Sequence, residues 1–423
     1  MARSALRLPG RPASAPSRCV ALCVALAAST TARVVAAQGA PAQGTPAQEA
    51  PAQGAAAPAP GGVSVATGGD ARLVLSGYVE AYWQYNFNVP QNGVTAWRGF
   101  DNRHNTFDIS NAVFDAAWSS RRVQGRLTLQ VGTTAELFYA AEPARRAIPG
   151  ASRSDTEVWS HLQQANVGFR MPGDDRILVE AGIFLSPIGP ETIAVRDNWN
   201  WSRSNLFYGL PFYHTGLRAT FSLAPRHAVA FMVTNGWNSV IDGNSAKSVM
   251  IHYTYTRDDE TGVTLLYLGG VERADDDPLG QSWRSLVDAT ARTRVSRYLS
   301  LMAHVNGGGE RTALGVDYWL AAAAYARLDL TRSLRVALRA DVFYESSPTD
   351  AGRIFWPASW MASQTATVEV APAPQVALRA EYRHDLASDA IFYRGASFDG
   401  ATMRERFNAR TQDTVTGGLV AWF

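Results

Sequence analysis

The chain has 423 residues, of which 18% are charged and 10% are aromatic, and its formal net charge is +2. No run of about 18 or more apolar residues occurs in it, which excludes a helical membrane protein. The basic residues form no tract of about five or six, so the sequence also argues against nucleic acid as a partner.

The first 37 residues predict an export signal peptide. Arginines at positions 3, 7, 11 and 18 precede a short apolar stretch at 19–28, and Val35, Ala36 and Ala37 offer a small-residue cleavage site. Both cysteines, Cys19 and Cys23, lie in this segment. The mature chain therefore requires neither disulfides nor thiolate metal ligands.

Residues 38–70 predict a disordered, Pro/Ala/Gln-rich periplasmic linker. Pro-Ala-Gln recurs at Pro41, Pro46 and Pro51, and residues 39–62 contain no aromatic or branched apolar side chain. Such a segment cannot bury a core of its own. A contact of this segment with peptidoglycan or a partner is the alternative interpretation.

From Leu73 onward the sequence alternates with a period of two, which is typical of strands with one apolar and one polar face. In 334–345 and 376–385 the charged residues are spaced by two on one face. We place sixteen strands at 73–88, 105–119, 122–133, 159–171, 175–184, 212–223, 226–235, 247–257, 260–270, 282–295, 297–306, 315–330, 333–345, 357–370, 375–385 and 412–423. Most are long enough to cross a bilayer when tilted. Residues 71–423 therefore predict an all-β fold, a closed antiparallel transmembrane β-barrel.

The connections between these strands alternate in length. Even strands are followed by tight turns, and odd strands by longer segments at 89–104, 134–158, 185–211, 236–246, 271–281, 307–314, 346–356 and 386–411. Short periplasmic turns and long extracellular loops are typical of outer-membrane barrels, so we expect both barrel ends in the periplasm. Fourteen or eighteen strands remain alternatives, because 135–147 and 321–324 are ambiguous between strand and helix.

Three motifs carry a family resemblance. They are Gly182-Ile-Phe-Leu-Ser-Pro-Ile-Gly-Pro-Glu191, Arg203-Ser-Asn-Leu-Phe207 and Tyr213-His-Thr-Gly216. With these motifs the segment from Leu73 to Phe423 resembles the putative β-barrel porin-2, OmpL-like family. The resemblance implies pore activity in a bacterial outer membrane and carries over no catalytic residue.

The expected function is passive diffusion of small hydrophilic solutes or ions through an outer-membrane porin. The alternatives are a non-conducting structural or adhesive surface barrel and a solute-specific anion or sugar channel. Expected partners are outer-membrane lipids and lipopolysaccharide, a second copy in a homo-oligomer, and the assembly machinery, for which the C-terminal Phe423 resembles the recognised terminal aromatic.

The expected site is the lumen, because a barrel of about sixteen strands leaves a water-filled interior. The longest of the candidate loops, 185–211, is expected to bend inward and narrow the pore, with an outward loop over the mouth as the alternative. Its candidate constriction residues are Glu191, Arg196, Asp197, Trp199, Trp201 and Arg203. Opposed charges there would orient dipolar solutes, and the tryptophans serve as packing anchors or stack on sugar rings.

Ten basic and ten acidic residues fall on the predicted lumen face, and this balance predicts weak ion selectivity. The principal candidates for the pore wall are Glu80, Arg126, Glu180, Arg218, Arg284, Arg292, Arg335, Arg339, Asp341, Arg379, Glu381 and Arg383. A purely structural role, in which these charges pair with one another, is an equal alternative.

An enzyme is not expected. The seven histidines include no His-x-x-x-His pair beside carboxylates, and no motif joins Ser, His and a carboxylate at one rim. The sequence therefore predicts no catalytic residue, no metal site and no cofactor.

Overall fold

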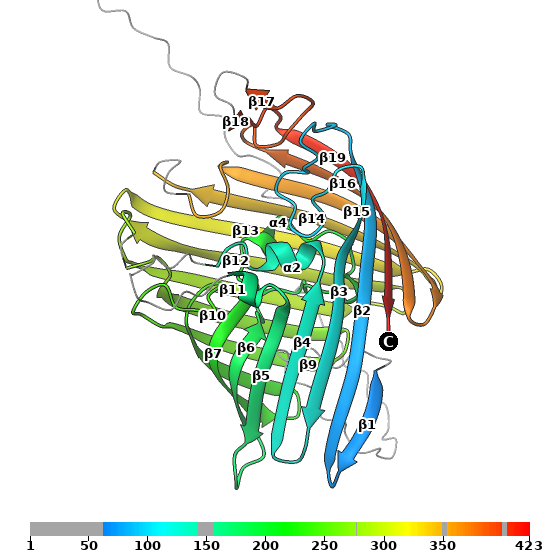
Figure 1. Cartoon of the computed structure of the whole chain (residues 1–423), viewed down its shortest axis with the longest axis vertical. Coiled ribbons are helices and arrows are strands. Elements are labelled where there is room, and N and C mark those ends of the chain that lie inside the picture. The colour runs from blue at the N-terminus through cyan, green and yellow to red at the C-terminus, as the bar shows by residue number, and fades with distance from the viewer. Residues whose placement is uncertain (1–61, 143–155, 276, 349–352, 400–403) are drawn as a thin grey trace, which may run out of the picture. The chain divides into compact units, whose positions relative to one another are not determined.

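The computed structural model describes residues 62–142, 156–275, 277–348, 353–399 and 404–423. Strands β2 through β16, together with β19, form a closed antiparallel ring of sixteen strands, each hydrogen-bonded to the next (Figure 1). The predicted fold class and strand number are confirmed. The predicted signal peptide and residues 38–61 lie outside the described residues.

Apart from the end of β12, the ring strands have bounds within a few residues of those predicted. They are β2 (Ala71–Asn86), β3 (Thr106–Ser119), β4 (Val123–Val131), β5 (Leu162–Arg170), β6 (Ile177–Leu185), β7 (Tyr213–Ala224), β8 (His227–Thr234), β9 (Ser248–Asp258), β10 (Thr261–Val271), β11 (Trp283–Arg294), β12 (Leu299–Thr312), β13 (Gly315–Asp329), β14 (Leu334–Ser346), β15 (Trp360–Ala373), β16 (Val376–Ala387) and β19 (Thr411–Trp422). The Ala-rich stretch 321–324 lies within β13 and is a strand.

The remaining elements are short. Helices α2 (Thr133–Phe138), α3 (Thr156–Trp159), η1 (Val195–Asp197) and α4 (Asn205–Tyr208) lie in the long connections, and β17 (Phe398–Asp399) pairs with β18 (Arg404–Glu405). Within the described ranges no helix is long and apolar enough to cross a membrane.

A strand that the sequence did not predict precedes the ring. β1 (Val63–Gly68) lies within the segment that we assigned to the linker, and it pairs antiparallel with the start of β2. Phe423 exchanges backbone hydrogen bonds with Gly77, just beyond this pairing. The start and the end of the barrel sequence therefore share one strand, β2.

The prediction of a long loop at 307–314 is wrong, because β12 continues to Thr312 and only two residues separate β12 from β13. The predicted loop begins with three consecutive glycines, Gly307 to Gly309, but these pair with both neighbouring strands. A Cβ atom on Gly308 would lie 2.4 Å from the ring of Trp319. Glycine is used here because the indole ring packs directly over the strand backbone.

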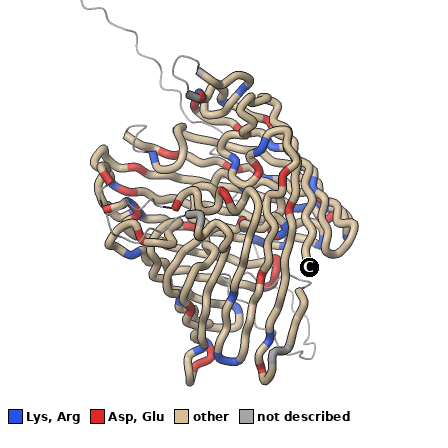
Figure 2. The backbone as a smooth tube through the Cα atoms, in the orientation of Figure 1, with Lys and Arg blue, Asp and Glu red and all other residues tan. Residues whose placement is uncertain are grey.

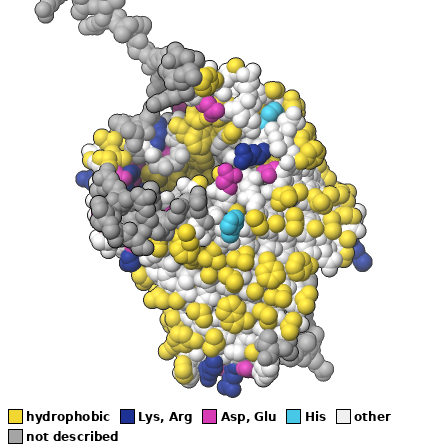
Figure 3. All heavy atoms as spheres, viewed as in Figure 1, with side chains coloured by type: hydrophobic (Ala, Val, Ile, Leu, Met, Phe, Trp, Pro, Cys, Tyr) yellow, Lys and Arg dark blue, Asp and Glu magenta, His cyan; other side chains and the backbone are white. Residues whose placement is uncertain are grey.

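Side chains alternate between the lumen and the outer wall as the period of two requires. In β14, for example, Leu338 is 47% exposed on the outer wall whereas its neighbour Arg339 is 2% exposed on the inside. Apolar side chains cover much of the outer wall in Figure 3, and arginines gather at the turns at its lower end. Along the strands, acidic and basic residues are intermingled (Figure 2).

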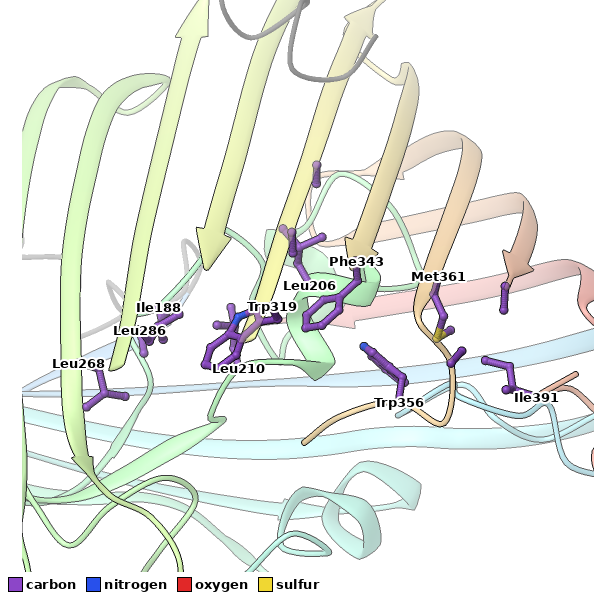
Figure 4. Close-up of a cluster of buried hydrophobic side chains, with 14 of the residues drawn as sticks. Ile188, Leu206, Leu210, Leu268, Leu286, Trp319, Phe343, Trp356, Met361 and Ile391 are labelled. Carbon is purple, nitrogen blue, oxygen red and sulfur yellow. The ribbon is translucent and has the colours of Figure 1, made fainter. Parts of the chain in front are cut away.

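The interior also contains an apolar cluster, drawn in Figure 4. Leu206, Trp356 and Ile391 come from connecting segments, and they gather with strand residues such as Trp319 and Phe343. Trp319 and Phe343 lie near the strand ends that the long loops join. The half of the lumen nearer the loops is therefore partly filled by apolar side chains.

Candidate functional site: the lumen and its inner loop

The connection between β6 and β7, residues 186–212, is folded inside the barrel. Val195, Arg203 and Leu206 are fully buried, and Trp201 is 1% exposed. α4 in this loop begins after Ser204, whose side chain accepts a hydrogen bond from the backbone N–H of Phe207. We name this segment the inner loop.

Arg379 and Glu381 of β16 hold the middle of the inner loop. The Arg379 guanidinium donates to the carbonyls of Val195 and Asn198, both at 2.8 Å, and of Asn200 at 3.1 Å. The Glu381 carboxylate accepts from the backbone N–H groups of Trp201 at 2.6 Å and Ser202 at 3.0 Å. An irregular segment inside a barrel leaves its backbone groups without strand partners, and these wall charges supply them.

Strand β14, which is separated from β16 by β15, holds the second half of the inner loop. Arg339 pairs with Glu191 at 3.0 Å and also donates to the carbonyl of Ser202. Asp341 accepts from the backbone N–H of Asn205 at 3.1 Å. Charge-assisted hydrogen bonds thus fix the inner loop against the β14–β16 wall. Such bonds are stronger than hydrogen bonds between neutral groups.

Two further wall residues add to the attachment. Arg383 of β16 donates to the carbonyl of Arg203, and the carboxylate of Glu80 in β2 accepts from the N–H of Val195 at 2.6 Å. Both wall residues are almost fully buried. Six of the predicted wall residues therefore bind the inner loop: Glu80, Arg339, Asp341, Arg379, Glu381 and Arg383.

The other predicted wall residues lie on the lumen face in ion pairs or beside a cavity. Arg218 pairs with Glu180 at 2.7 Å, and Arg335 pairs with Glu369 at 2.7 Å. The remaining pairs are Arg126 with Asp115 at 2.7 Å and Arg284 with Glu310 at 2.9 Å. Arg292 lines the largest cavity described below.

The six predicted residues of the inner loop do not share one environment. Arg196 is 89% buried at its side chain and lies 5.0 Å over the ring of Tyr78, with Asp197 at 3.6 Å. Trp199 lies under the guanidinium of Arg327 at 5.1 Å. Trp201 and Arg203 instead face the packed interior of the loop. Glu191 binds Arg339 of the wall and also lines the largest cavity described below.

Arg203 shows this difference most clearly. It is fully buried, and it donates to the carbonyls of Thr192, Ile193 and Trp201 within its own loop. It lines none of three cavities identified in the described part of the barrel. Arg203 therefore stabilises the shape of the inner loop rather than facing solvent.

The largest of these cavities, with a volume of about 460 Å³, lies on the side of the inner loop opposite the β14–β16 wall. The loop contributes apolar side chains such as Ile188 and Ile193, whereas strands β3, β4 and β11 contribute Asp115, Arg126 and Arg292. Arg196 lines this cavity and also the two smaller ones. The inner loop thus separates hollows of different character, with Arg196 at their junction.

Sequence reasoning missed two of the paired carboxylates, Asp115 and Glu310. A register shift between β2 and β3 leaves Ser110 and Asn111 both buried, so the faces of β3 exchange along its length. Glu310 follows the glycines that suggested a loop. An arginine directly opposite on a neighbouring strand was the available signal, as for Arg126 and Asp115.

Among the described residues, no group of three His, Cys, Asp or Glu side chains is arranged to hold a metal ion. The charges that gather in the lumen are arginines and carboxylates engaged with the inner loop or with one another.

The family model of the putative β-barrel porin-2, OmpL-like proteins matches residues 72–423. No curated protein matches this chain. Among solved structures it is similar to the outer membrane channel DcaP of Acinetobacter baumannii, with 13% identity, a TM-score of 0.53, and 84% of this chain and 97% of that chain covered.

Two further structures have the same fold. The anion-selective porin from Comamonas acidovorans is 11% identical, with a TM-score of 0.51 and coverage of 84% of this chain and 100% of that chain. OmpT of Vibrio cholerae in its trimer form is 7% identical, with a TM-score of 0.51 and the same two coverages. The family match extends over the whole sixteen-stranded ring. This chain therefore belongs to the putative β-barrel porin-2, OmpL-like family and is a channel protein of the bacterial outer membrane for small solutes.

Proposed function

We propose that this protein passes small hydrophilic solutes and ions by passive diffusion, and that the inner loop narrows the lumen. The main support for this proposal is the attachment of this loop to one side of the barrel. Arg339, Arg379 and Glu381 bind its backbone against β14–β16, and the 460 Å³ cavity lies on its opposite side. The passage accordingly runs between the inner loop and the walls formed by β2–β5 and β9–β12.

The polar lining supports this route. Gln163, Gln164 and Thr264 face the same cavity as Arg126 and Arg292. Such side chains offer hydrogen bonds to water and to dipolar solutes, and the intermingled charges of both signs favour weak selectivity between cations and anions at this side.

A non-conducting barrel is the second candidate, because the apolar cluster around Trp319 and Phe343 partly fills the half of the lumen nearer the long loops. Conductance of the refolded protein in a planar bilayer separates the two. Stepwise currents support the passive channel, and a bilayer that stays silent supports the plugged barrel.

The route itself is tested by a single cysteine. Thr264 of β10 lines the cavity, whereas its neighbour Leu265 is 49% exposed on the outer wall. With both native cysteines in the predicted signal peptide, T264C and L265C form a matched pair. A charged, membrane-impermeant thiol reagent should reduce the current of T264C and leave that of L265C unchanged; no effect on T264C contradicts the proposed route.

The proposal also covers the export of the chain, its periplasmic linker and its partners. The protein acts as a channel and not as an enzyme, residues 1–37 are removed on export, and residues 38–61 form a periplasmic linker before β1. Its outer wall contacts lipids and lipopolysaccharide, and copies of the barrel associate into a homo-oligomer. Phe423, half exposed at the end of β19, is the element presented to the outer-membrane assembly machinery.

A further inference from the structure

A second hollow lies on the sealed side of the inner loop, beside the short turns that follow β13 and β15. Its volume is about 390 Å³, and its charged lining consists of four arginines and one carboxylate: Arg196, Arg332, Arg335, Arg379 and Glu369. A smaller cavity of about 100 Å³ shares Arg196, Arg335, Arg379 and Glu369 with it and adds one further arginine, Arg327, and one further carboxylate, Asp197. We name the two together the arginine hollow.

The positive charge of the arginine hollow is only partly neutralised. Glu369 forms ion pairs with two guanidinium groups at once, because those of Arg335 and Arg379 each lie 2.7 Å from its carboxylate. Arg335 has a second, weaker partner in Asp329 at 3.6 Å. Arg332 makes no hydrogen bond or ion pair with its side chain in the described part of the chain.

Arg196 adds an unsatisfied donor set at the inner end of the arginine hollow. Its Nε and Nη1 atoms are buried and have no hydrogen-bond partner among the described residues, although the guanidinium lies 3.6 Å from Asp197. A buried donor without an acceptor is costly, so an acceptor supplied by a solute is favourable at this position.

We propose that the arginine hollow binds a small multivalent oxyanion that enters from the periplasmic side. Guanidinium groups present forked donors that match the paired oxygens of phosphate and carboxylate. Arg379 is already bound to Glu369 and to inner-loop carbonyls, so the donors left for an anion come from Arg196, Arg332 and Arg335. Three such groups around one hollow favour an anion with two or more negative charges over chloride. The volume fits inorganic phosphate or a short dicarboxylate, and the 44% exposed side chain of Arg335 lies at the open end.

This inference adds a solute class to the proposed function for one side of the channel. It rests on the proposed function only for the transfer of the anion from the arginine hollow into the passage. The anion held in the arginine hollow lies next to Arg196, which also lines the 460 Å³ cavity. Arg196 is therefore the point at which a bound anion leaves the arginine hollow for the passage.

Binding is measured first, by titrating inorganic phosphate or succinate into the refolded barrel in detergent micelles by calorimetry. The test variant R332A/R335A removes two arginines of the open end. The matched control R176A/R226A removes two exposed arginines from other periplasmic turns, outside the three cavities. Loss of charge-assisted hydrogen bonds should weaken anion binding by about tenfold or more in the test variant, and not in the control.

The pattern of outcomes separates the two proposals. If wild type binds only phosphate or only succinate, that anion is the preferred one of the two. If R332A/R335A and R176A/R226A lose anion affinity equally, the effect is one of net charge and the proposed site is overturned. No binding of either anion by wild type also overturns it. Anion binding with a silent bilayer leaves the arginine hollow in place and contradicts the channel, whereas currents without anion binding contradict only this inference.

Side-specific addition gives an independent readout. Phosphate added on the periplasmic side should reduce the chloride current of wild type at lower concentration than phosphate added on the other side, and R332A/R335A should lose this difference. An equal effect from both sides in wild type contradicts entry through the arginine hollow.

Discussion

The attachment of the inner loop by Glu381 can be tested by the substitution Glu381→Ala. The carboxylate accepts hydrogen bonds from the backbone N–H groups of Trp201 and Ser202, and Glu381 is 4% exposed. A buried donor left without its partner costs about 1–3 kcal/mol, so the loss of both bonds weakens this attachment by about 2–6 kcal/mol. Since about 1.4 kcal/mol corresponds to a factor of ten, the detached population rises at least about tenfold.

Detachment should be local, because Arg379 still holds three carbonyls of the inner loop. Single-channel recordings of E381A should therefore show transitions from the wild-type level to a larger conductance as the backbone at Trp201 and Ser202 leaves the wall. Glu180→Ala is the matched control, since Glu180 is a buried wall carboxylate that pairs with Arg218 and lines none of the described cavities. One conductance level identical to that of wild type in E381A, or the same new level in both variants, would refute the reasoning.

Two other pairs of substitutions test the packing and the charges of the inner loop. A Cβ atom on Gly418 would lie 2.2 Å from the ring of Trp201, whereas one on Gly417 would meet no described atom within 4 Å. G418A should therefore lower the free energy of unfolding by about 1–3 kcal/mol in denaturant titration, and an equal effect of G417A would contradict this packing. R203A should likewise destabilise the folded barrel by about 1–3 kcal/mol with ion selectivity unchanged, because Arg203 binds carbonyls of its own loop. R196A should shift the reversal potential in a salt gradient toward cation preference and change stability little, and the opposite assignment of these two effects would show that the roles are reversed.

The strands could be predicted from the sequence because the face of a strand residue depends on its position in a local repeat. Arg335, Arg339 and Asp341 were assigned to the lumen from alternation alone, and the structure places them there. The prediction failed where a local signal had a tertiary cause. Gly308 falls in the predicted loop 307–314, but it lies in β12 and provides space for Trp319 of the neighbouring strand.

The composition of the site was visible in the sequence, whereas its arrangement was not. Arg196 and Arg203 occupy the same predicted loop and have the same chemistry, yet one lines three cavities and the other is fully buried.

The alternating pattern by itself determined a closed barrel of about sixteen strands with a polar interior, because the backbone of each strand must be hydrogen-bonded away from lipid while its apolar face contacts lipid. The structure then fixed the number at sixteen. Only the tertiary structure decided where the inner loop lies. Its attachment joins residues about 180 positions apart, such as Trp201 and Glu381, and such contacts follow from barrel closure and loop packing rather than from any local repeat. The side of the lumen that stays open is therefore a property of the folded ring.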